Sequence, residues 1–173
     1  TENALDLAIS GDGYFSVQQA AVTIAYSRDG SFKLSAEGNL VTAGGQTLLP
    51  AITVPQNAAS LTIGRDGVVT VELSNGGGSS QIGQLQLSRF VNNSGLQPIG
   101  RNLMQQTNAS GDPLVVLPGA DGAGMLMQGA LEASNVNVVE EMVNMIETQR
   151  AYEVNSKAIS AADGMLRFLN NNL

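Results

Sequence analysis

The stretch NVVEEMVNMIETQRAYEVNSKAISAADGMLRFL, residues 137–169, decides the fold, because it is a long segment with helical periodicity in a chain otherwise rich in turns. Glycine and proline almost disappear beyond Asn135, and apolar residues recur at spacings of three and four. Asn137 suits an N-cap, and Glu140 completes a capping-box pattern. We predict one C-terminal helix of about 32 residues, about 48 Å long at about 1.5 Å per residue.

Two groups of positions give this helix its apolar character. A patch near the start is followed by a run with strict three-four spacing, in which Asn155 is a register-setting polar residue. The helix could pack on the domain before it, but it is longer than a small domain can cover. We therefore predict a coiled-coil-type assembly interface made of Val139, Met142, Val143, Ile146, Tyr152, Asn155, Ile159, Ala162, Leu166 and Leu169.

From Ala4 to about Glu132, short apolar or β-branched runs alternate with glycine-centred turns such as Asp29-Gly30 and Asp66-Gly67. This pattern predicts an antiparallel β domain, a meander or small sandwich, over residues 1–133 and a helical assembly segment over residues 134–173. The predicted strands are Leu5–Ile9, Tyr14–Gln18, Val22–Ser27, Ser31–Leu34, Leu40–Thr42, Ala51–Val54, Leu61–Ile63, Val68–Leu73, Gln84–Phe90 and Met125–Gln128. We expect a mobile loop at residues 75–80 and an irregular excursion at residues 105–124.

Composition excludes several classes of function. The 173 residues are 43% hydrophobic and carry a net charge of −7, which argues against nucleic acid as a partner. The sequence contains neither histidine nor cysteine, so disulfides, a cysteine nucleophile, a histidine base and the usual zinc sites are excluded. It shows neither a run of about 20 apolar residues nor a secretory signal at its start.

Carboxylates are numerous enough to raise the idea of a glycosidase pair: Asp6, Asp12, Asp29, Asp66 and Glu72. Three of these aspartates precede glycine in predicted turns, where the side chain bonds the local backbone. We therefore expect no catalytic residue, no metal site and no cofactor. A carbohydrate-binding or carbohydrate-active β domain with a helical tail remains a different-class alternative, although only 4% of the residues are aromatic.

Residues 134–157, from Ser134 to Lys157, resemble the C-terminal signature shared by flagellar rod and hook proteins. Residues 8–15 and 26–32 resemble the opening of the β domain of the same family, so the resemblance spans nearly the whole chain.

The resemblance implies a non-enzymatic structural subunit that is exported by the flagellar type III apparatus and assembles helically in the bacterial basal body. Its partners would be copies of itself and neighbouring rod and hook proteins, with no membrane insertion and no small-molecule substrate. Members normally carry an N-terminal helix that pairs with the C-terminal one. Since this sequence starts at Thr1 in a strand-like pattern, we expect it to be part of a longer protein.

Different subunits within the family share this C-terminal signature, so the family alone does not fix the subunit. The hook protein usually carries an additional outer β domain, and the compact length here argues against it. Which of the family's rod subunits this chain comes from remains open.

Overall fold

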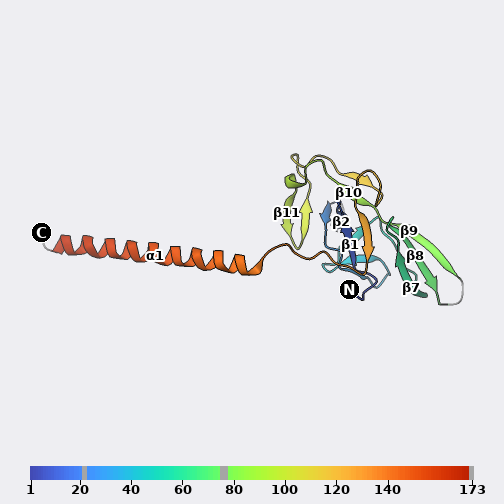
Figure 1. Cartoon of the computed structure of the whole chain (residues 1–173), viewed down its shortest axis with the longest axis horizontal. Helices are drawn as coiled ribbons and strands as arrows, with labels where there is room; N and C mark the ends of the chain where they lie inside the picture. The colour runs from blue at the N-terminus through green and yellow to red at the C-terminus, as the bar shows by residue number, and fades with distance from the viewer. Residues whose placement is uncertain (21–22, 75–77, 172–173) are drawn as a thin grey trace. The chain divides into compact units, whose positions relative to one another are not determined.

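The computed structural model describes residues 1–20, 23–74 and 78–171. It divides into two compact units, Thr1–Glu132 and Ala133–Leu173, and each is described by itself. Antiparallel strands make up the first unit, and one long helix makes up most of the second (Figure 1). The predicted fold class, an antiparallel β domain followed by one long C-terminal helix, is confirmed.

The strands are short and run antiparallel to their partners. They are β1 (Leu7–Ser10), β2 (Phe15–Ala20), β3 (Thr23–Ser27), β4 (Phe32–Leu34), β5 (Leu40–Thr42), β6 (Thr47–Leu49), β7 (Ala58–Ile63), β8 (Val68–Leu73), β9 (Ser79–Gln84), β10 (Leu87–Arg89), β11 (Gln97–Gly100), β12 (Leu103–Gln105), β13 (Leu114–Val116) and β14 (Met125–Gln128). A short 3-10 turn, Asn93–Gly95, precedes β11.

The largest sheet has seven strands in the order β11-β12-β3-β2-β6-β5-β4. Its centre is the β2–β3 hairpin, with Val17 opposite Ala25, and β6 pairs with the other edge of β2. Strands β7, β8 and β9 form a separate three-stranded sheet, and β1–β14 and β10–β13 form two pairs. Local hairpins thus alternate with pairings between distant segments.

The core consists of the inward-facing residues of these sheets. Phe15 and Val17 are fully buried two positions apart on β2, as strand alternation requires. The Phe15 and Phe32 rings meet edge to face with centroids 5.0 Å apart. A smaller cluster forms around Phe90, whose ring centroid lies 4.7 Å from that of Tyr26.

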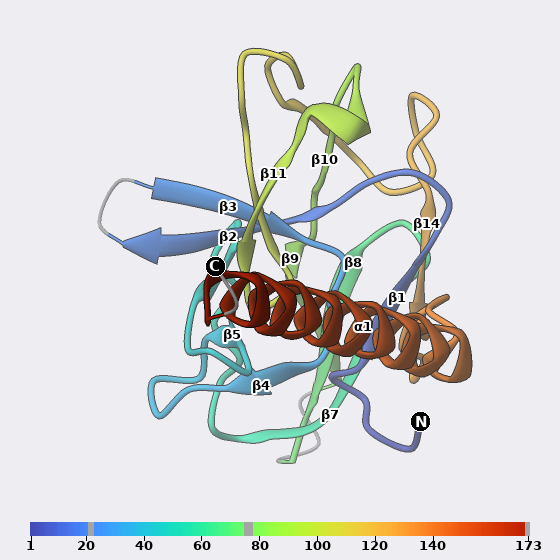
Figure 2. The same ribbon diagram turned by 90° about the vertical axis from the view of Figure 1, so that its left-hand side faces the viewer.

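Pairing of the first strand with the last closes the unit. Leu7 on β1 lies opposite Gln128 on β14, and Figure 2 shows the two strands side by side. The Gln128 side chain accepts a hydrogen bond from the Ile63 backbone N–H at 3.1 Å and donates to the Leu61 carbonyl at 3.0 Å. Strand β14 therefore joins β1 to β7 and connects two sheets.

Arg28, just after β3, ties the neighbouring turns together. Its guanidinium donates to the carbonyl oxygens of Ile9, Gly11 and Gly13 at 3.1–3.2 Å. Its Nε also donates to Glu132 Oε2 at 2.8 Å. A planar guanidinium can reach these acceptors at once, whereas a lysine ammonium lacks this fork of donors.

Several strand predictions need correction. The predicted strand Ala51–Val54 makes only an isolated bridge between Asn39 and Thr53, and the strand in this region is β6, before Pro50. Ile52 and Val54 are buried although they lie outside any strand. The alternation of apolar residues in this segment therefore indicates burial and not a strand. The predicted strand Gln84–Phe90 is interrupted, because Gln84 ends β9 and β10 begins at Leu87.

Strands with polar or mixed sequences were not predicted. Ser79 and Ser80, expected in a mobile loop, lie in β9 because β8 supplies backbone partners for this polar segment. Residues 75–77 of that loop, and Val22 of a predicted strand, lie outside the described residues. Strands β11 and β12 were also missed, and β13 interrupts the irregular excursion expected at residues 105–124.

Helix α1 (Val138–Asn171) is continuous over 34 residues. Within the described residues, no helix combines the length and apolar character needed to cross a membrane.

Replacing Gly30 by alanine tests the packing of β1. An added Cβ would lie 1.6 Å from the Leu7 carbonyl oxygen, so backbone must move. We expect Gly30→Ala to lower the free energy of unfolding by at least about 2 kcal/mol. Gly45→Ala is the control: its Cβ meets nothing within 4 Å, and only its positive φ of 82° opposes alanine. Equal losses in urea unfolding would contradict the packing argument.

Candidate assembly interface

The predicted start of the helix is confirmed at Asn137. Its side-chain oxygen accepts from the Val139 backbone N–H at 3.2 Å, and its carbonyl accepts from the Glu141 N–H at 3.1 Å. The predicted capping box does not form in the described part of the chain, because Asn137 caps the N–H of Val139 rather than that of Glu140 and the Glu140 side chain makes no hydrogen bond. Glu140 and Glu141, both in the first turn, are still stabilised by the positive end of the helix dipole.

A continuous α1 divides the predicted interface between two sides of the helix. Val139, Met142, Val143 and Ile146 form the first face; Tyr152, Asn155, Ile159, Ala162 and Leu166 form the second face. Ile159 follows Ile146 by thirteen residues, which at about 100° per residue is three turns plus about 220°. The two faces therefore point in roughly opposite directions.

The sequence signal for this change was the step of six residues from Ile146 to Tyr152, which breaks the three-four spacing. Leu169 lies in α1, but its side chain is outside the described residues.

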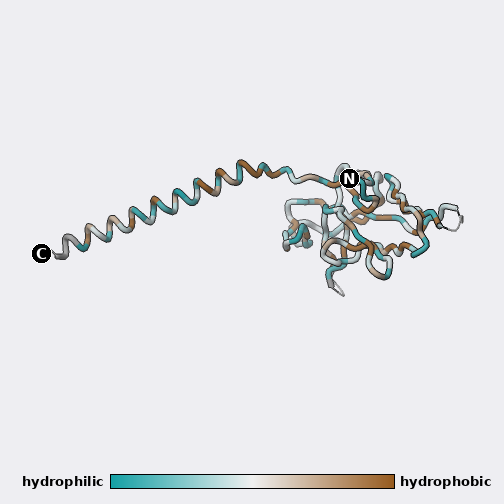
Figure 3. Tube along the Cα trace, turned by 90° about the horizontal axis from the view of Figure 1, so that it is seen from below, coloured by the Kyte–Doolittle hydropathy of each residue, from teal (hydrophilic) through white to brown (hydrophobic). Residues whose placement is uncertain are grey.

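Considered by itself, a single helix cannot bury either face. Val139, Tyr152 and Ile159 are 69%, 77% and 71% exposed. In Figure 3, apolar residues gather in the first turns of α1. Only a partner surface from outside the helix can bury these side chains. Each Å² of apolar surface removed from water then stabilises the contact by about 25 cal/mol. The interface role of these residues stays a prediction.

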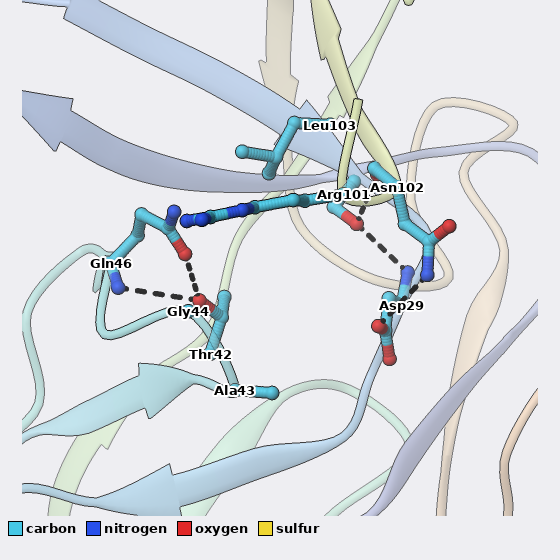
Figure 4. Close-up of a pocket in the computed structure, with 9 residues that line it drawn as sticks. Asp29, Thr42, Ala43, Gly44, Gln46, Arg101, Asn102 and Leu103 are labelled. Carbon is cyan, nitrogen blue, oxygen red and sulfur yellow. Dashed lines mark hydrogen bonds between the residues drawn. The ribbon is translucent and has the colours of Figure 1, made fainter. Parts of the chain in front are cut away.

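An open depression of about 540 Å³ lies in the β unit (Figure 4). Arg101 and Asn102 form its upper turn between β11 and β12, both in the left-handed conformation with φ of 54° and 59°. The Arg101 side chain extends toward Gln46 (Figure 4). The residues that line the depression are Ser27, Asp29, Thr42, Ala43, Gly44, Gln46, Arg101, Asn102 and Leu103.

The polar groups of this depression largely satisfy one another. Asp29 accepts from the Ser31 hydroxyl at 2.6 Å and from the Asn102 amide at 3.2 Å, and Ser27 donates to the Asn102 carbonyl at 2.8 Å. Partial burial works to raise the pKa of Asp29, but the hydrogen bonds from Ser31 and Asn102 outweigh it and lower that pKa. A carboxylate held ionised in this way acts as a turn anchor.

Three of the other four candidate carboxylates accept hydrogen bonds from nearby groups. Asp6 accepts from Asn3 at 2.8 Å, Asp66 from the Val68 N–H at 3.2 Å, and Glu72 from Ser60 at 3.0 Å. In the described residues the Asp12 side chain makes no hydrogen bond, unlike the predicted turn bond, and only its backbone carbonyl accepts from the Gly124 N–H at 2.7 Å. In the residues that the structure describes, no three acidic residues gather into a group that could hold a metal ion.

Family models match both units of the chain. Residues 8–71 match the model described as "Flagellar hook protein FlgE/F/G D1 domain", and residues 127–172 match "Flagellar basal body rod FlgEFG protein C-terminal". Both units therefore match one class of proteins, the flagellar hook and basal-body rod proteins.

Similar curated proteins narrow this class. The chain is 52% identical over 98% of its length to the flagellar basal-body rod protein FlgG of Buchnera aphidicola subsp. Schizaphis graminum, covering 65% of that protein. It is 46% identical over 96% of its length to FlgG of Borreliella burgdorferi, covering 63% of that protein. The flagellar hook protein FlgE of Salmonella typhimurium is 41% identical over 68% of this chain and 29% of its own length.

The chain belongs to the flagellar rod and hook protein family, and its match to basal-body rod proteins extends through both units. It spans just under two thirds of the length of the rod proteins that it matches.

Replacing Asp29 by asparagine tests the turn anchor. At pH 7 we expect a loss of at most about 1 kcal/mol, because an amide donor would face the donor of Asn102 and solvent screens the site. The folded pKa of Asp29 lies below its ordinary value of 3.8, so the carboxylate stabilises the fold above that pH. That contribution disappears as pH falls through the folded pKa.

The measurement is urea unfolding of both proteins between pH 7 and pH 3. The difference between wild type and Asp29→Asn should narrow toward the acidic end, and Asp12→Asn provides the control for loss of one charge. A difference that stays constant with pH would contradict the role of Asp29.

Two asparagines of the helical unit make a matched test of the cap. We expect Asn137→Ala to reduce helicity by removing a cap worth about 1 kcal/mol. Asn144→Ala, inside α1, should preserve or raise helicity because alanine has the higher helix propensity. Circular dichroism at 222 nm measures both. Equal signals for the two variants would show that Asn137 does not cap the helix.

Proposed function

We propose that this chain is part of a distal rod subunit of the bacterial flagellar basal body, a structural protein that assembles into a tubular drive shaft. The identity to basal-body rod proteins, 52% across both the β unit and the helix, carries this proposal. Residues 51–55 and 62–67 also resemble the distal rod subunit. The subunit is exported by the flagellar type III apparatus and acts in the rod that spans the periplasm.

Torque transmission explains why the chain needs surfaces and no catalytic centre. A shaft spreads load over many subunit contacts, and a helical polymer grows when a heterologous contact does not close into a ring. The two faces of α1 supply apolar surface for inner contacts. The cross-connected β unit supplies a body that holds its shape, with Gln128 and Arg28 joining its segments.

The partners in this proposal are copies of the subunit and neighbouring rod and hook proteins. Nucleic acid is disfavoured by the net charge of −7. We propose no enzymatic activity, small-molecule substrate, cofactor or membrane insertion. This function is supported by the family and by the local structural roles of the carboxylates.

A hook subunit is the second candidate within the family, because the hook protein of Salmonella typhimurium also aligns. Its alignment covers 68% of this chain, whereas those of the rod proteins cover 96–98%, which favours the rod. A proximal rod subunit is a further candidate on the shared C-terminal signature. The open depression gives the carbohydrate alternative no support, since its lining contains no aromatic residue for stacking on a sugar.

A charge on the second face tests the proposed function in cells. We expect Leu166→Asp, introduced into the full-length gene, to abolish swimming, because a charge buried in a helix seam costs several kcal/mol. Ser160→Asp is the matched control: it adds the same charge about 120° away around the helix.

Immunoblotting should show equal amounts of both variants, and limited proteolysis should show an intact β unit. Motility in soft agar is the readout. If cells with Leu166→Asp swim as well as cells with Ser160→Asp, the proposed role of this face is wrong.

A further inference from the structure

The open depression of the β unit contains an arginine whose charge has no partner. Arg101 and Asp29 are the two charged residues of its lining, and they form no ion pair with each other in the residues that the structure describes. The Arg101 side chain also makes no hydrogen bond in that part of the chain, although it extends toward Gln46 (Figure 4). The N–H donors of its guanidinium are therefore available to a ligand.

The backbone conformation at Arg101 is unfavourable for an arginine. Its φ of 54° lies in the left-handed region, and the central positions of such a hairpin turn favour asparagine, aspartate and glycine. Side chains other than glycine that are held in this region cluster at ligand-binding sites, where the function of the residue offsets the strain. Because asparagine suits this turn better, stability of the fold does not explain an arginine here.

Gln46 supplies further donors near Arg101. Its side-chain carbonyl accepts a hydrogen bond from the Thr42 hydroxyl, and its backbone N–H donates to the same hydroxyl at 3.3 Å. The N–H groups of the Gln46 side chain make no hydrogen bond within the described ranges. The amide lies close to Gly44, where an added Cβ would be 2.6 Å from the Gln46 Oε1 atom. Glycine at position 44 therefore gives this side chain room to hold its donors at the depression.

The acceptors of the lining are already engaged by neighbouring groups. Asp29 accepts from the Ser31 backbone N–H at 3.0 Å, from the Ser31 hydroxyl at 2.6 Å and from the Asn102 amide at 3.2 Å. The Asn102 carbonyl accepts from the Ser27 hydroxyl at 2.8 Å. What remains for a ligand is a set of N–H donors, one group of which is cationic. A guanidinium forms two parallel hydrogen bonds with a carboxylate, so a carboxylate fits these donors.

We propose that this depression binds an acidic side chain on the surface of a partner protein, with Arg101 and Gln46 donating to its carboxylate. Sites for small ligands enclose most of the ligand, whereas this depression is open, which favours a carboxylate carried by a larger molecule. Ala43 and Leu103 add apolar lining for the methylene groups of a glutamate. The inference concerns a surface of the β unit alone and does not depend on the proposed function.

The test uses a blocked glutamate, N-acetyl-glutamate methylamide, as the probe. Heteronuclear NMR of this chain follows the side-chain N–H signals of Arg101 and Gln46 during titration. We expect the probe to shift both signals until they saturate, and its neutral glutamine analogue to leave them unchanged. Acetate, a free carboxylate, should bind more weakly than the probe, because it lacks the methylene groups that the apolar lining covers.

Three variants connect the binding to the proposed donors. Arg101→Asn should bind the probe at least about tenfold more weakly, read on the Gln46 signal, and should unfold in urea no more easily than the wild type. Gly44→Ala displaces the flexible end of Gln46 and should weaken binding by a smaller factor. Arg65→Asn is the matched control, because it removes the same charge from an exposed position outside the lining, and binding should not change.

Each of the other outcomes overturns the proposal. Absence of a saturable shift would show that the depression does not bind a carboxylate, and equal binding of the glutamine analogue would show that charge plays no part. Equal affinity for acetate would show a site for a free carboxylate rather than for a side chain. Equal losses in Arg101→Asn and Arg65→Asn would show attraction by overall charge. Motility of Leu166→Asp cells tests the proposed function separately, so that function stands or falls independently of these results.

Discussion

The pairing of β1 with β14 is the contact on which the β unit depends. It joins the first strand to the last across nearly the whole unit, so it must offset the conformational entropy of closing a very long loop. Neither strand has more than four residues, and backbone bonds in so short a pair are insufficient alone. The additional stabilisation comes from burial of Leu7, Ile9 and Leu126, and from Gln128, which extends the connection to β7.

Arg28 strengthens the same closure at the point where the β unit ends. Its guanidinium joins the β1–β2 turn to Glu132, the last residue of the unit. A charge-assisted bond between partly exposed groups contributes modestly to stability, but several carbonyl acceptors on one rigid group also fix geometry.

The helical unit is stabilised differently from the β unit, because a single helix cannot bury its own apolar side chains. Helices of this length are held in proteins chiefly by packing of an apolar face, with the N-cap and favourable first-turn charges as smaller terms. A division into two opposed faces makes the helix a connector between neighbours in the proposed assembly.

Sequence alone determined the fold class, the helix and its cap at Asn137, because helical periodicity and capping are properties of neighbouring residues. It also indicated the local roles of Asp29 and Asp66, whose turn bonds span two residues. Tertiary structure decided the rest. Polar β9 is a strand only because β8 lies beside it, and Ile52 is buried without being in a strand. Likewise, Gln128 and Arg28 act on partners far away in sequence, and no local pattern encodes a contact whose two halves meet only after the chain has folded.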